Sequence, residues 1–237
     1  MTRQDIGERL NYKGDDVFLD GKVIFSVPHR ESQSEINLLG VIKEAGKIYV
    51  GSGQCCFGPI SILENRAKNG EEPEYELDGL RVPNFNVYDI IPAYVDNKKT
   101  RFCNNGAILT TGYGCAGSGV RLIDTNYPKT IDVVSNEEFR GLWGDTRVQG
   151  WVMPYLRVDE QKGTITLDLL KAGYRVKAGK SRDPTLPSIL LDSDAEESYV
   201  SEDIWASKDL TARLVEIGVD IEKTIEQNKG YVRISHE

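Results

Sequence analysis

Short turn sequences that join stretches rich in β-branched residues constrain the fold of this chain more than any other feature. Residues 18–25 contain Asp20-Gly21 between apolar flanks, and an Asp-Gly pair accepts the positive φ values that a two-residue hairpin turn requires. Strands closed by such local turns run antiparallel, because parallel neighbours need a long crossover connection. The first two-thirds of the chain is therefore expected to be antiparallel β-structure.

Other segments with the same pattern indicate a fold built mainly from hairpins. Three more hairpins are expected over residues 36–50, 75–82 and 151–170, and short strands over residues 107–111, 130–134 and 174–177. Short helices are predicted over residues 60–68 and 136–142, the second with Ser135 as its N-cap. The predicted fold class is β-rich α+β: an antiparallel meander, sandwich or barrel with a C-terminal amphipathic helix.

The clearest helical pattern lies near the C-terminus, where aliphatic residues recur every three or four positions. They are Leu210, Leu214, Ile217, Ile221 and Ile225, a spacing that places them on one face of a helix. Ser207 suits the N-cap, Gly218 is a point where the helix can break, and residues 231–235 could add a last strand. Two uses of the apolar face stay open: packing on the protein's own sheet, or binding a partner subunit.

Composition divides the chain into three parts. Residues 1–178 form the predicted β-rich body, residues 179–200 an acidic loop or linker, and residues 201–237 the C-terminal helical segment with its final strand. The middle part contains two prolines and the acidic run 192–197. This composition is typical of a loop.

The charge balance excludes some classes of partner. Lys and Arg total 29 and Asp and Glu total 37, so the net charge is −8. This argues against a broad basic face for nucleic acid or for an anionic membrane. The sequence has no apolar run long enough for a membrane helix and no apolar segment of the secretory type in its first residues. We expect the protein in the cytoplasm or assembled into a particle.

Metal and cofactor signals are weak. Two histidines and four cysteines are present, without the Cys-x-x-Cys or His-Glu-x-x-His spacing of zinc sites. Cys103 and Cys115 could pair, and this stays open. Asp192, Asp194 and Glu196 form a weak calcium pattern, but Glu197 stands where an EF-hand loop needs glycine. We expect no metal and no cofactor.

The densest glycine segment covers residues 112–119 and permits two chemical interpretations. Its Gly112, Gly114 and Gly117 have the Gly-x-Gly-x-x-Gly spacing of dinucleotide-binding loops, which open a helix between parallel strands. The surrounding hairpins argue against that fold. The segment also holds Cys115 and Ser118, and either could act as a nucleophile beside backbone N–H groups that bind an oxyanion.

A hydrolase would take its other groups from earlier in the chain. His29 would act as the base, and Asp89 would orient it. The sequence Tyr-Gly-Cys-Ala-Gly over residues 113–117 resembles the nucleophile turn of viral chymotrypsin-like cysteine proteases. That resemblance implies a double β-barrel hydrolase using His29, Asp89 and either Cys115 or Ser118.

The hairpins and the amphipathic C-terminal segment favour a different function. We expect a non-enzymatic structural or assembly subunit of a larger complex, such as a virion, in which protein subunits form a homo-oligomer or larger assembly. The residues expected to bind a partner are those of the apolar face, Leu210, Leu214, Ile217, Ile221 and Ile225. The hydrolase is the alternative.

Overall fold

The protein is described by a computed structural model. It describes residues 9–27, 36–42, 46–52, 59–68, 71–81, 83, 85–103, 106–113, 117–126, 129–143, 148–176, 197–199 and 204–234. Most of these residues lie in antiparallel strands and few lie in helices. The β-rich α+β class is confirmed, and none of the sheets formed by the described strands closes on itself.

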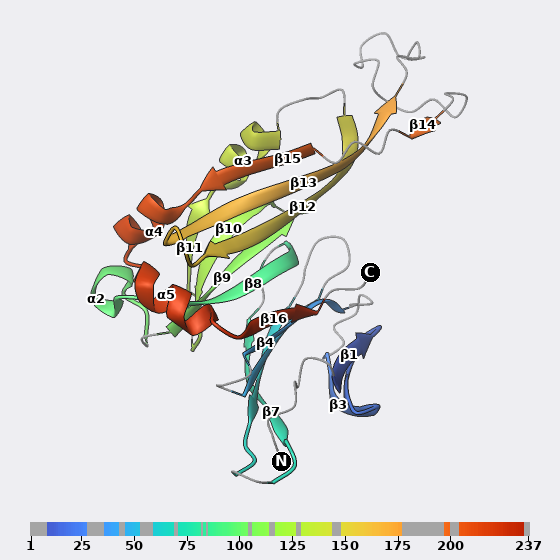
Figure 1. The fold of residues 1–237 in the computed structure, drawn as a ribbon, viewed down its shortest axis with the longest axis vertical. Coiled ribbons are helices and arrows are strands. Elements are labelled where there is room, and N and C mark those ends of the chain that lie inside the picture. The colour runs from blue at the N-terminus through green and yellow to red at the C-terminus, as the bar shows by residue number, and fades with distance from the viewer. Residues whose placement is uncertain are drawn as a thin grey trace.

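The described strands form four sheets (Figure 1). The first has the order β1-β2-β3, with β1 at Leu10–Lys13, β2 at Asp16–Leu19 and β3 at Lys22–Ser26. The second has the order β16-β4-β5-β6-β7, with β4 at Ile36–Ile42, β5 at Lys47–Ser52, β6 at Ile60–Asn65, β7 at Tyr75–Arg81 and β16 at Tyr231–Ile234.

The third and fourth sheets follow later in the chain. The third has the order β11-β10-β9-β8, with β8 at Asn86–Tyr94, β9 at Gly106–Tyr113, β10 at Gly119–Asp124 and β11 at Thr130–Val134. In the fourth, β13 at Thr164–Val176 pairs with β12 at Val148–Asp159, β14 at Glu197–Tyr199 and β15 at Ile204–Asp209.

Four short helices complete the described fold. They are α2 at Asn97–Thr100, α3 at Asn136–Trp143, α4 at Thr211–Ile217 and α5 at Ile221–Asn228. Within the described part of the chain, no helix has the length and apolar character needed to span a membrane.

Three hydrophobic clusters join the four sheets in succession. The first and second sheets share one cluster, the second and third share another, and the third and fourth share the largest together with α4. The third sheet serves two clusters because side chains alternate along a strand: Ala107 and Leu109 of β9 enter the largest cluster, and Ile108 enters the one beneath the second sheet.

Several local predictions are confirmed. Asp20 and Gly21 join β2 to β3 with φ values of 51° and 75°. The hairpins predicted over residues 36–50 and 151–170 are present as β4–β5 and β12–β13. Ser135 begins α3 with a capping box, because its N–H donates to Glu138 Oε2 at 3.0 Å and its Oγ accepts from Glu138 N at 3.2 Å.

Two local predictions in the second sheet are wrong. Residues 60–65 form the strand β6, not a helix, and its first four residues are buried; a short apolar run suits a buried strand as well as a helix. Residues 75–81 form one strand, not a hairpin. The β6–β7 register shifts so that Asp78 falls between the residues paired with Ile62 and Leu63, so Asp78-Gly79 accommodates a bulge.

The single C-terminal helix that the sequence predicts is instead a strand and two helices. Ser207 lies in β15, paired with Asp168 of β13, and is not an N-cap. The break at Gly218 is present, with a φ of 102°, and the N-cap of α5 is Asp220, whose side chain accepts from Lys223 N. The predicted final strand is present as β16 and pairs with β4.

Candidate functional site: a buried carboxylate where three sheets meet

Three edge strands meet around a buried carboxylate. β8, β12 and β16 are the terminal strands of the third, fourth and second sheets. Asp89 of β8 is fully buried, and the β8–β9 register shifts between Val87 and Asp89. A bulge of this kind redirects a side chain out of the regular alternation, and here the Asp89 carboxylate contacts β12 and β16.

The carboxylate of Asp89 is bound through both of its oxygens. Oδ1 accepts from Ile90 N at 2.9 Å and lies 2.9 Å from Nε of Arg233. Oδ2 accepts from Leu156 N at 2.6 Å. Arg233 also donates through Nη2 to the Leu156 carbonyl. The ion pair therefore binds both backbone groups of one β12 residue and joins the three strands.

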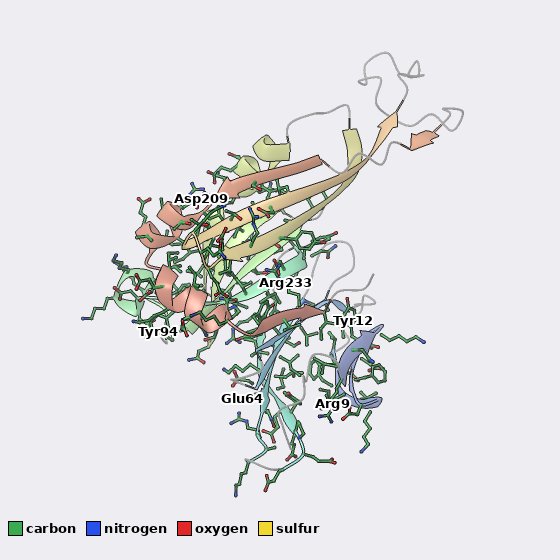
Figure 2. All side chains as sticks on the ribbon, viewed as in Figure 1. Arg9, Tyr12, Glu64, Tyr94, Asp209 and Arg233 are labelled. Carbon is green, nitrogen blue, oxygen red and sulfur yellow. The ribbon has the colours of Figure 1, made fainter. Side chains whose placement is uncertain are left out.

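Burial dominates the electrostatics of this site. It raises the pKa of Asp89 to about 6, although Arg233 and the two backbone N–H groups favour the charged form. Burial, with the nearby Asp89 charge, also holds the pKa of Tyr231 well above its ordinary value and raises that of Tyr155. Figure 2 shows Arg233 near the middle of the molecule, and 32% of its side chain is exposed.

The C-terminal segment covers the free edge of β8. Tyr94 N donates to Thr224 Oγ1 at 3.0 Å and the Tyr94 carbonyl accepts from Asp220 N at 2.9 Å. The Pro92 carbonyl accepts from Asn228 Nδ2 at 2.8 Å, and the Ile90 carbonyl accepts from the Tyr231 hydroxyl. Edge strands expose unpaired backbone groups, and α5 and β16 satisfy these groups one after another.

A second buried carboxylate has a similar structural use. Asp124 at the end of β10 is fully buried. Its Oδ2 accepts from Cys103 N at 2.6 Å and its Oδ1 from Asn126 N at 2.8 Å. The buried Arg81 of β7 donates from Nε to the Asp124 carbonyl at 2.9 Å. The Asp124 side chain thus fixes the chain at Cys103, before β9, and at Asn126, after β10. The bond from Arg81 joins the second sheet to the third.

The structure does not bring Asp89 and Ser118 together. Asp89 is paired with Thr111 on β9, and Thr111 with Val120 on β10, so Ser118 lies two strands away, about 10 Å across the sheet. Its backbone N donates to Asn136 Oδ1 at 3.0 Å. His29 and Cys115 lie outside the described residues, and their catalytic roles stay a prediction.

The described end of the glycine segment, at Gly119, leads into the strand β10 and not into a helix. Gly112 ends the β9–β10 pairing opposite Gly119, and the strand that follows is antiparallel, so the dinucleotide-binding interpretation is wrong. Packing explains the glycine at position 112, because a Cβ there would overlap the ring of the buried Phe85.

The predicted partner-binding residues lie against the protein's own core. Leu210, Leu214 and Ile225 are buried, while Ile217 and Ile221 are partly buried against the largest cluster. In this conformation the chain itself covers the apolar face, as expected if the face packs on the protein's own sheet. Binding of a partner through these residues stays a prediction.

Metal binding finds no support among the described side chains, which contain no group of three metal-ligating residues. The weak calcium candidates Asp192, Asp194 and Glu196 lie outside the described residues.

Arg233 was not predicted from the sequence. Its only signal is a charged residue within the short apolar run Tyr231–Ile234, where a charge facing a sheet junction needs a partner.

Comparisons with known proteins identify no relative. No family model matches the chain, and no match is found among curated proteins or solved structures.

Proposed function

We propose that this protein is a non-enzymatic structural or assembly subunit of a larger complex, of the kind found in virions, with a layered β-sandwich-like body. One observation carries the proposal: the buried charges of the described fold bind backbone groups and each other. Both oxygens of Asp89 are taken by two N–H groups and Arg233. A catalytic carboxylate needs an oxygen that can reach a substrate.

The same bonds support a rigid body. Asp89 and Arg233 join three sheets, and Asp124 and Arg81 join two of them a second time. Buried polar networks that are fully hydrogen-bonded make a structure rigid and specify one arrangement of its parts. Rigidity of this kind is what a subunit needs when it must present the same surfaces in every copy.

The test is the mass of the protein in solution. Light scattering over a wide concentration series should show particles larger than one chain, or a partner should be recovered when the tagged protein is isolated from its source. A strict monomer without a partner would overturn the proposal. If that monomer also showed one rapidly alkylated thiol at Cys115, the hydrolase would be favoured, because a thiol paired with histidine has a lowered pKa.

A further inference from the structure

The aliphatic pattern of the C-terminal segment continues across the turn that separates α4 from α5. Leu214, Ile217, Ile221 and Ile225 recur at spacings of three or four residues, which is the pattern of one uninterrupted helix face. In the structure α4 ends at Ile217 and α5 begins at Ile221. Residues 211–228 contain no proline, so the sequence is compatible with a single helix over both elements.

Two local features create the turn. Gly218 has a φ of 102°, a left-handed value that favours glycine. Asp220 caps α5, because its Oδ1 accepts from Lys223 N at 3.0 Å. A continuous helix needs neither feature. The two short helices and one long helix are therefore alternative conformations of the same residues, separated by a glycine turn and a cap.

Few buried side chains hold the segment that follows the turn. Among the described residues beyond Gly218, only Val219, Thr224 and Ile225 are buried, and no residue of β16 is. Backbone pairing with β4 and polar contacts to β8 and β12 supply the remaining attachment. Segments with few buried apolar contacts are the parts of a protein that open at the lowest cost.

The surface that accepts this segment recognises it specifically. β16 pairs with β4 (Figure 1). The Tyr231 hydroxyl donates to the Ile90 carbonyl, and Nε of Arg233 lies 2.9 Å from Asp89 Oδ1. The accepting groups belong to β4, β8 and β12, and every copy of the chain carries them. The same segment of a second copy would therefore find the same strand pairing, hydrogen bond and ion pair.

We infer that α5 and β16 of one copy bind β4, β8 and β12 of a second copy when α4 and α5 become one helix. Gly218 is the hinge of this exchange. A helix over residues 211–228 is about 27 Å long and carries β16 away from the β4 edge of its own chain. Reciprocal exchange closes a dimer, whereas onward exchange builds a longer assembly. This inference rests on the proposed function and names the partner as a second copy of the chain.

Crosslinking between two marked chains tests the exchange directly. Val41 and Val232 lie opposite one another in the β4–β16 pairing, a separation that a disulfide spans. In chains whose four native cysteines are replaced by serine, one chain carries Val41→Cys and the other Val232→Cys. Oxidation of the mixture should give covalent dimers that contain one chain of each kind, detected on a denaturing gel without reductant.

A matched pair in a hairpin that is not exchanged controls for random collision. Lys13 and Asp16 lie opposite one another in the β1–β2 pairing. A mixture of one chain with Lys13→Cys and another with Asp16→Cys should give no covalent dimer above background. Equal crosslinking at both pairs would overturn the exchange.

Two hinge variants should increase the exchange. Gly218→Ala places a Cβ 2.7 Å from Lys99 Cβ and opposes the φ of 102°. Asp220→Ala removes the cap of α5. Both changes disfavour the turn and not the continuous helix. Light scattering should therefore show dimers of each variant at about tenfold lower protein concentration than for the wild type.

Proline at position 221 should have the opposite effect. Ile221 is the first residue of α5, where proline costs no intrahelical hydrogen bond, and Asp220 has the extended backbone that suits a following proline. In a continuous helix the same proline would break the helix. Ile221→Pro should therefore give no mixed crosslink, whereas Ile221→Ala, which removes the same side chain, should still exchange. Circular dichroism should show that all variants are folded.

The outcomes distinguish this inference from the proposed function. Oligomers or a recovered partner without the mixed disulfide between positions 41 and 232 would overturn the exchange and leave an assembly subunit that uses another surface. Equal crosslinking of Ile221→Pro and Ile221→Ala would do the same for the helical hinge. A wild-type protein that stays monomeric at every concentration, with no partner, would overturn both the exchange and the proposed function.

Discussion

Nε of Arg233 lies 2.9 Å from Oδ1 of Asp89, and this contact binds the last described strand to the edge of a neighbouring sheet. The aspartate is fully buried, whereas the arginine side chain is 32% exposed. Water can therefore reach one partner and not the other. This asymmetry decides how the protein should respond to pH and to loss of either residue.

The first prediction concerns pH. Because burial raises the pKa of Asp89 from 3.8 to about 6 in the folded state, the folded protein binds its proton more tightly than the unfolded chain does. The stability contributed by this group is fully present below about pH 4 and is lost as the pH rises through 6. The loss corresponds to roughly 3 kcal/mol.

Comparison with Asp89→Asn isolates this contribution, because other carboxylates titrate in both proteins. Urea unfolding at several pH values should show the wild type losing stability relative to the variant between pH 4 and 7. Parallel curves for the two proteins would contradict a raised pKa at Asp89.

The second prediction concerns the loss of the cation. Arg233→Ala leaves the Asp89 carboxylate buried without its ion pair and should lower the free energy of unfolding at pH 7 by about 3 kcal/mol. Arg157→Ala is the control, since its pair with Asp168 lies at the surface with 56% of the arginine side chain exposed, and it should cost less than 1 kcal/mol.

Combining Asp89→Asn with Arg233→Ala should recover part of the loss, because no buried charge is then left alone. Chemical denaturation of the single and double variants measures the coupling. Simple additivity would show that the two residues do not interact in solution.

A third prediction concerns the covered edge of β8. Thr224→Val removes the hydroxyl that accepts from Tyr94 N and keeps the shape of the side chain. It should destabilise the protein by about 1–3 kcal/mol, because the amide loses its partner. Hydrogen exchange at the Tyr94 amide should accelerate, whereas Thr224→Ser should retain slow exchange. Equal exchange rates in both variants would argue against this bond.

The fourth prediction concerns Gly112. Gly112→Ala forces a methyl group into the ring of Phe85 and should cost about 1–3 kcal/mol. Adding Phe85→Leu should relieve part of that cost by removing the ring. Gly163→Ala is the comparison, because nothing lies within 4 Å of its added carbon and only its φ of 66° opposes alanine, at about 1 kcal/mol. A cost at Gly112 that Phe85→Leu does not relieve would refute the packing role.

Local turn chemistry was predictable where the turn alone decides the structure. Asp20-Gly21 forms the expected hairpin turn with positive φ at both residues. The same dipeptide at Asp78-Gly79 lies inside β7, because pairing with β6 over the whole segment outweighs the local preference. The local sequence shows the turn preference of Asp-Gly, but it does not show which strand will pair with the segment in the folded protein.

The candidate site was predictable only in part. Asp89 was selected as an acid, but its partner Arg233 lies in a different sheet, far along the chain, and no local pattern connects them. The spacing from Leu210 to Ile225 fits one helix face, yet the positive φ of Gly218 turns the chain between α4 and α5. The apolar residues remain on the core side of both helices because hydrophobic burial, and not helix continuity, fixes their position.

The pairing of β16 with β4 has a consequence for biosynthesis. A ribosome produces β4 and β8 long before the residues that complete them, since Tyr231–Ile234 pairs with β4 and residues 220–231 satisfy the edge of β8. Until then the nascent chain carries two open strand edges, each able to pair with another nascent chain. Folding of the middle of this molecule therefore waits for translation of its last described strand.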